Sequence, residues 1–142
     1  MKVLWVEDHY RAQEMLMVAA TKAVRKRLQL DLVIAANLME AERRIRFEKF
    51  DLVVLDLRLP DSFDEGMTVT RVASMGQFRM AVVSASEQRD AVAKAAIAAG
   101  CDCAPNAIAK EDLPFNRFIQ RPEEFYEFLQ SLMPQSEPQA AA

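Results

Sequence analysis

FDLVVLDLRLPD, the stretch from Phe50 to Asp61, contains an apolar run interrupted by a single carboxylate. From Leu52 to Leu57 every residue is apolar except Asp56. A short continuous apolar run of this kind is typical of a strand that is buried on both faces of a parallel sheet. Carboxylates are seldom buried unless they are paired with a cation or bind a metal. The sequence therefore predicts a buried strand with a compensated carboxylate near its end.

The composition is that of an ordinary globular domain. The chain has 142 residues, of which 51% are apolar and 27% charged, and its net charge is −3. An acidic chain with an isoelectric point near 5.3 is not expected to bind nucleic acid. No apolar window is long enough to cross a membrane, and the start, MKVLWVED, is typical of a strand rather than a secretory signal. We expect a cytoplasmic protein with reduced thiols at Cys101 and Cys103.

Short apolar runs alternate with helical patterns along the whole chain. We expect strands at residues 2–6, 30–36, 50–57, 78–85 and 101–108. We expect helices at residues 10–27, 38–49, 67–75, 87–99 and 122–132. Five such repeats predict an α/β fold, a doubly wound five-stranded parallel sheet with helices on both faces. We expect one domain over residues 1–133 and a disordered tail over 134–142.

Polar residues end three of the expected strands. Glu7 and Asp8 follow the first strand, Asp56 ends the third, and Ser84 ends the fourth. Ligands of such sheets bind outside the carboxyl ends of the strands, so these side chains are expected to gather at one edge. Three carboxylates at close range repel one another, and a divalent cation relieves that repulsion. The sequence therefore predicts an all-oxygen Mg²⁺ site.

These segments resemble the receiver domain of two-component response regulators. The similar segments are VLWVED, DLVVLDLRLPD, VVSAS and AAGCD, which follow one another in family order and cover residues 1 to about 104. The resemblance implies a flavodoxin-like sheet of strand order 2-1-3-4-5. It also implies that the protein is a signalling switch and not an enzyme, except that it catalyses its own phosphorylation and dephosphorylation.

The resemblance also assigns roles to the strand-end residues. Asp56 would accept a phosphoryl group from a histidine kinase or a phosphotransfer protein. Asp8 would bind Mg²⁺ directly, Glu7 through water, and Arg58 through its backbone carbonyl. Ser84 stands where the family has a Ser or Thr that bonds the phosphoryl oxygens. Phosphorylation would then change a surface that binds an output protein.

The lysine that the family has at the end of its last strand is not in register here. Counting from AAGCD without gaps, that position is Ala107. Lys110 lies three residues further on and is the preferred candidate. Another register places Arg121-Pro122 at the family's Lys-Pro, with Phe118 at the position of a switch aromatic. A third alternative is that no cation fills the role, which would favour a pseudo-receiver that binds a partner without phosphorylation.

Overall fold

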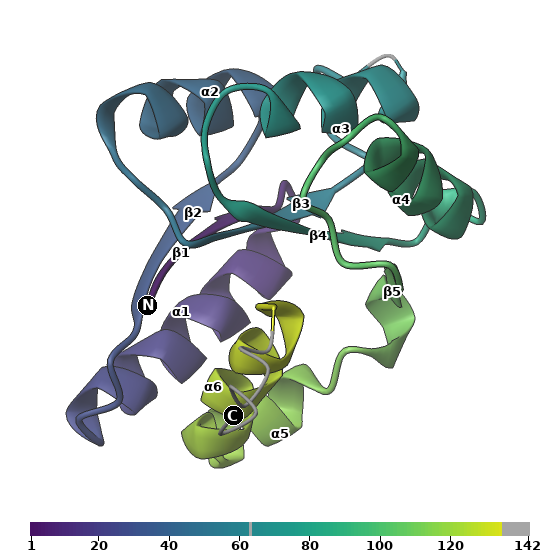
Figure 1. Ribbon diagram of the computed structural model, residues 1–142. Helices are drawn as coiled ribbons and strands as arrows, with labels where there is room; N and C mark the ends of the chain where they lie inside the picture. The colour runs from purple at the N-terminus through teal and green to yellow at the C-terminus, as the bar shows by residue number, and fades with distance from the viewer. Residues whose placement is uncertain (63, 135–142) are drawn as a thin grey trace, which may run out of the picture.

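Five parallel strands form the centre of the molecule, in the order β2-β1-β3-β4-β5 (Figure 1). The computed structural model describes residues 1–62 and 64–134. The strands are β1 (Lys2–Val6), β2 (Asp31–Ala35), β3 (Leu52–Asp56), β4 (Arg79–Ser84) and β5 (Ile108–Ala109). The predicted parallel sheet and its order are confirmed, because each strand pairs with its neighbours in parallel.

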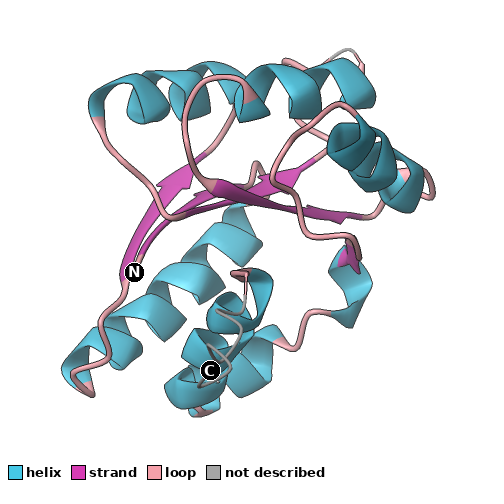
Figure 2. Ribbon diagram, viewed as in Figure 1, coloured by secondary structure: helices cyan, strands magenta, loops and turns pink. Residues whose placement is uncertain are grey.

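Helices cover both faces of this sheet (Figures 1 and 2). On one face lie α2 (Leu38–Phe47), α3 (Glu65–Ala73) and α4 (Arg89–Ala98). On the other lie α1 (Tyr10–Arg25), α5 (Phe115–Gln120) and α6 (Pro122–Leu132). A 3₁₀ turn, η1 (Lys110–Asp112), joins β5 to α5. Within residues 1–62 and 64–134, none of the helices is both long enough and apolar enough to span a membrane.

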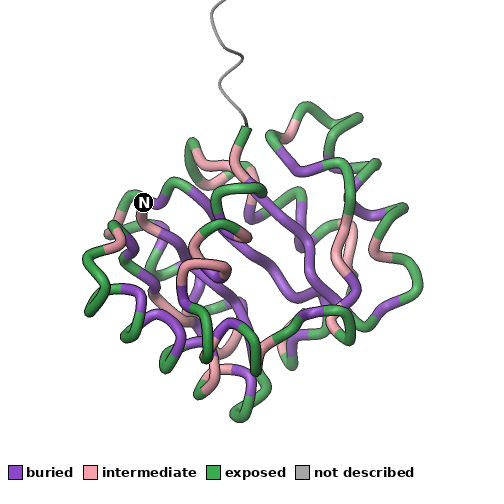
Figure 3. The backbone as a smooth tube through the Cα atoms, turned by 90° about the horizontal axis from the view of Figure 1, so that it is seen from below, coloured by how far each residue is buried: buried purple, intermediate pink, exposed green. Residues whose placement is uncertain are grey.

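The core has one half on each side of the sheet, as the continuous apolar runs predict. Leu52 and Val54 face α1 and α6, whereas Val53 and Leu55 face the layer of α2, α3 and α4. All four side chains are fully buried. Figure 3 shows these buried strands crossing the centre of the molecule, with exposed segments around them. Both faces of β3 are covered, so its terminal residue, Asp56, is held in a fixed position at the edge of the sheet.

Two side chains, the carboxamide of Asn37 and the carboxylate of Asp61, accept hydrogen bonds from N–H groups at the start of α2. Asn37 accepts a hydrogen bond from the Glu40 N–H at 2.8 Å and is the N-cap of α2. Asp61 accepts from the N–H groups of Leu38 and Met39, at 2.8 and 2.9 Å. Asp61 belongs to the loop between β3 and α3, so this second cap fastens that loop to the start of α2. The loop begins directly after Asp56.

The predicted fifth strand is wrong over most of its length. Only Ile108 and Ala109 form β5, and the preceding segment makes a single isolated bridge, between Cys103 and Met80. Pro105 lies in this segment, has no N–H to donate to a sheet, and therefore interrupts the pairing. The chain re-enters the sheet at Ile108, two residues before η1 begins at Lys110, and β5 ends at Ala109.

The segment between β5 and the last helix is helical, which the sequence patterns did not predict. In α5, Phe118 is buried against Phe125 and Phe128 of α6, with ring centroids 5.1 and 5.3 Å apart. Phe118 is thus a core residue. The last helix has the predicted bounds, 122–132, with Pro122 in its first turn. The predicted disordered tail, 134–142, lies outside the described residues except for Pro134.

Candidate functional site

Glu7 and Asp56 lie side by side at the carboxyl edge of the sheet. Glu7 follows β1 and Asp56 ends β3, and these two strands are adjacent. They are 1% and 2% exposed, which is rare for carboxylates, whereas the neighbouring Asp8 is exposed. One carboxylate oxygen from each of the three residues lies within 4.8 Å of the others. The predicted cluster of carboxylates is therefore present.

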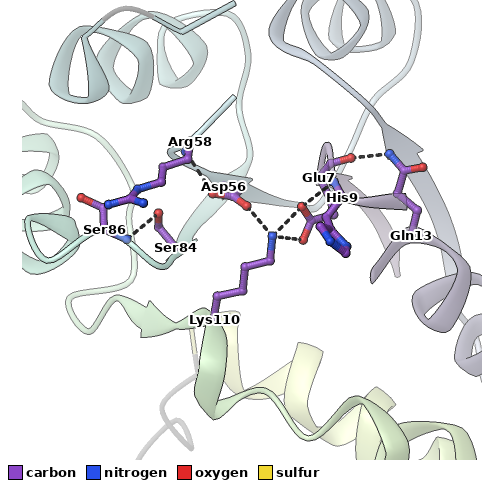
Figure 4. A network of polar contacts seen from close by, with 8 residues as sticks. All are labelled: Glu7, His9, Gln13, Asp56, Arg58, Ser84, Ser86 and Lys110. Atoms are coloured by element: carbon purple, nitrogen blue, oxygen red, sulfur yellow. Dashed lines mark hydrogen bonds and ion pairs between the residues drawn. The ribbon is translucent and has the colours of Figure 1, made fainter. Parts of the chain in front are cut away.

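The Lys110 side chain extends from the start of η1 toward Glu7 and Asp56 and lies below them in the view of Figure 4. Its Nζ lies 2.7 Å from the carboxylate of Glu7 and 3.0 Å from Oδ2 of Asp56. The lysine side chain is 23% exposed, so the ion pair is largely shielded from water. Lys110 can reach the acids because it is the first residue after β5, and β5 pairs with the end of β4.

Backbone groups fix the orientation of both buried carboxylates. The Arg58 N–H donates to Oδ1 of Asp56 at 3.0 Å, and the His9 N–H donates to Oε2 of Glu7 at 3.1 Å. Gln13, on the first turn of α1, donates from Nε2 to the Glu7 carbonyl at 2.5 Å (Figure 4). Asp56 is thus held through one oxygen by Arg58 and through the other by Lys110. Sequence reasoning missed Gln13. The available signal was its position four residues after His9, at the start of an expected helix.

Ser84 ends β4 beside this site and is buried. Its Oγ accepts a hydrogen bond from the Ser86 N–H at 3.1 Å, and the Ser86 hydroxyl donates to Oε2 of Glu65 at 3.0 Å. The Ser84 hydroxyl keeps its proton available as a donor. The role of Ser84 toward a phosphoryl group remains a prediction, as does that of the Arg58 carbonyl toward a metal.

Burial and the lysine act in opposite directions on Glu7. Burial raises the pKa of the Glu7 carboxyl, and the charge of Asp56 raises it further, while the hydrogen bonds from Lys110 and His9 lower it only in part. For Lys110, burial lowers the pKa of the ammonium, but its bonds to Glu7 and Asp56 outweigh burial and leave the pKa raised. The ammonium is therefore charged, and the cluster as a whole has too few positive charges for its carboxylates.

This set of donors fits Mg²⁺. Three carboxylates outnumber the single ammonium group, and within the described residues the Asp8 carboxylate has neither a hydrogen-bond nor an ion-pair partner. Every candidate ligand atom is an oxygen, which suits a hard divalent cation. Asp8, Glu7 and Asp56 would hold the ion, and their excess negative charge is the observation that favours it.

The other candidates for the missing lysine lie elsewhere. Ala107, the ungapped position, packs against the core on the α2–α4 side of the sheet. Arg121 is exposed at the junction of α5 and α6 and bonds neither Glu7 nor Asp56. Of the three alternatives, the structure brings only Lys110 to the acids.

Comparison with known proteins finds similarity in structure alone. No family model matches the chain, and no curated protein matches it. A two-component response regulator from Clostridium difficile is 18% identical with a TM-score of 0.66, over 93% of this chain and 94% of that one. The chemotaxis protein CheY4 of Vibrio cholerae is 22% identical with a TM-score of 0.64, over 93% and 98%.

A third similar structure was solved with a bound ligand. The response regulator TrrA of Thermotoga maritima, solved in complex with Mg²⁺ and BeF, is 18% identical with a TM-score of 0.62, over 93% of this chain and 98% of that one. The chain therefore has the fold of CheY-like response-regulator receiver domains, as the sequence motifs predict.

Proposed function

We propose that this protein is a phosphorylation-controlled signalling switch, in which Asp56 accepts a phosphoryl group from a histidine kinase or a phosphotransfer protein. The observation that carries the proposal is the ion pair between Lys110 and the two buried acids, Glu7 and Asp56. Burying charged groups costs stability, and clusters of this kind are found preferentially at functional sites. The fold and the Mg²⁺ complex of the similar TrrA structure support the same use.

The residues supply what in-line phosphoryl transfer requires. A carboxylate oxygen of Asp56 attacks the phosphorus of a phosphohistidine; the new P–O bond forms as the P–N bond breaks, and the imidazole leaves with the electron pair. The Arg58 N–H and the Lys110 ammonium hold Asp56 in position for this attack. Mg²⁺, when bound, neutralises charge on the phosphoryl oxygens.

Lys110 and Ser84 then respond to the new charge. Phosphorylation adds a charge of about −2 to an already acidic site. Lys110 now contacts an Asp56 oxygen, and we expect it to move to a phosphoryl oxygen, where the hydrogen bond is stronger. The Ser84 hydroxyl would donate a hydrogen bond to another phosphoryl oxygen. Lys110 begins η1, so its movement would alter the segment from η1 to α5 and the surface offered to an output protein.

The alternative, a pseudo-receiver that acts without phosphorylation, depends on the lack of a suitably placed lysine. Lys110 fills that position, so no observation favours the alternative. The site offers groups for the protein's own phosphorylation and dephosphorylation, and we propose no further enzymatic activity.

The experiment is intact mass spectrometry after incubation with acetyl phosphate, with and without Mg²⁺. We expect the mass of one phosphoryl group on the wild type only when Mg²⁺ is present. Asp56→Asn should take none. Asp31→Asn is the matched control, since Asp31 is an exposed aspartate at the other end of the sheet, and it should be labelled like the wild type. Equal labelling of Asp56→Asn would contradict the proposal.

A further inference from the structure

The loop between β4 and α4 is held to α3 by a side-chain contact that the proposed reaction does not use. The Ser86 hydroxyl donates to Oε2 of Glu65, in the first turn of α3, at 3.0 Å. Ser86 is buried and Glu65 is half-buried, so water competes poorly for this hydrogen bond. A hydrogen bond to a carboxylate is also stronger than one between neutral groups. The contact therefore restrains the loop.

Ser86 is bonded through its backbone as well. Its carbonyl accepts from Nη1 of Arg89 at 2.9 Å, and its N–H donates to Oγ of Ser84 at 3.1 Å. The hydrogen bond from the Ser86 N–H therefore restrains the Ser84 hydroxyl. Among the described residues no hydrogen bond joins Ser84 to Asp56, and Figure 4 shows the Ser84 hydroxyl bonded on its Ser86 side.

A phosphoryl group on Asp56 requires a different orientation of Ser84. To donate to a phosphoryl oxygen, the hydroxyl has to turn toward Asp56, and the Ser86 N–H has to follow it or lose its acceptor. Ser86 cannot follow freely while Glu65 holds it. The Nε of Arg89 is buried without an acceptor among the described residues, so the present loop arrangement leaves a donor unpaired at a free-energy cost.

We propose that Glu65 is a positioning residue that holds the β4–α4 loop, through Ser86, in the arrangement of the unphosphorylated protein. The inference rests on the proposed function, because it concerns the response to a phosphoryl group on Asp56. Glu65 acts through its hydrogen bond to Ser86 and not by repelling the phosphoryl group. Breaking the bond favours the phosphorylated arrangement, since the loop can then follow Ser84.

Four variants separate the hydrogen bond from the charge. Glu65→Ala and Ser86→Ala each remove the bond, and Ser86→Ala does so while the Glu65 charge remains. Glu65→Gln removes the charge but keeps an amide oxygen that can accept from Ser86. Glu87→Ala, at an exposed residue of the same loop, is the control for loss of a nearby negative charge.

The measurements are calorimetric titration with beryllium fluoride and Mg²⁺, and hydrogen exchange of residues 84–90 before any ligand is added. Glu65→Ala and Ser86→Ala should bind beryllium fluoride about ten- to a hundredfold more tightly, as expected for the loss of one hydrogen bond to a charged group. Both should also exchange faster in residues 84–90. Glu87→Ala should match the wild type in both measurements, and Glu65→Gln, which keeps a weaker, neutral acceptor, should lie between the wild type and Glu65→Ala.

Different results overturn the two proposals. If the wild type neither binds beryllium fluoride nor takes a phosphoryl group, the proposed function is wrong and this inference fails with it. If the wild type binds but Glu65→Ala binds equally or more weakly, the restraint by Glu65 is wrong and the proposed function stands. If Glu65→Gln tightens binding as much as Glu65→Ala, the charge acts and not the hydrogen bond, which also overturns the inference.

Discussion

Replacing Lys110 by methionine should destabilise the protein strongly in the absence of a divalent cation. The variant keeps an apolar side chain of similar length but leaves Glu7 and Asp56, 1% and 2% exposed, without their cation. At 2.7 and 3.0 Å, and with an effective dielectric constant of about 20, each contact has a Coulomb energy of about 6 kcal/mol, most of which the cost of desolvation offsets.

The net loss follows from measured cases of broken buried ion pairs. Removing one partner of such a pair costs about 3–5 kcal/mol. The Lys110 side chain is 23% exposed, so in its absence water can reach and partly solvate the two carboxylates. We therefore expect the lower end of this range, about 3 kcal/mol. The assay is urea unfolding in a chelating buffer, followed by circular dichroism. Lys94→Met, at an exposed lysine of α4, is the control and should change the free energy of unfolding by less than about 0.5 kcal/mol.

A second substitution tests whether the lost charge is the cause. Glu7→Gln in the Lys110→Met background leaves one buried charge in place of two, so it should recover part of the lost stability. A loss below about 0.5 kcal/mol for Lys110→Met would refute the claim that Lys110 neutralises Glu7 and Asp56. Removing an ammonium group that shields two buried carboxylates must lower the free energy of unfolding by more than that.

Three further outcomes follow from the same structure. In a Mg²⁺ titration, Asp8→Ala should weaken binding more than Glu7→Ala, because a direct ligand contributes more than one that acts through water; equal effects would contradict these roles. Asp61→Ala should cost about 1–2 kcal/mol in urea unfolding, because two N–H groups at the start of α2 lose their acceptor, whereas Asp90→Ala, in the first turn of α4, should cost less. Burial raises the pKa of the Cys103 thiol to about 11, so only about one molecule in a thousand carries the reactive thiolate at pH 8, and iodoacetamide should label the half-buried Cys101 first; faster labelling of Cys103 would show that it is not buried.

The sequence predicts most of the sheet because burial on both faces leaves a clear pattern. The apolar run around Asp56 and the N-cap at Asn37 are local signals, and both agree with the structure. Gly100 lies just after the end of α4, and its φ of 90° is the left-handed conformation that glycine adopts readily and that commonly ends a helix. Such features depend on neighbours in the sequence, so pattern reasoning can find them.

The region after Gly100 could not be predicted in the same way. Pro105 displaces the fifth strand, so counting from the preceding motif leads to Ala107 and misses the residue that reaches the acids. The helix α5 has only six residues and no side-chain cap, and it is held by the packing of Phe118 against α6. The bond between Ser86 and Glu65 joins two separate elements, and no local pattern marks it.

The central claim, that Asp56 carries the phosphoryl group, is tested most directly by locating the modification. The protein is incubated with acetyl phosphate and Mg²⁺, and then treated with borohydride, which reduces an acyl phosphate to the alcohol. Peptide mass mapping then shows which aspartate became homoserine. The account predicts reduction at Asp56 alone. Reduction at Asp8 or at any other carboxylate, or at none, would contradict it.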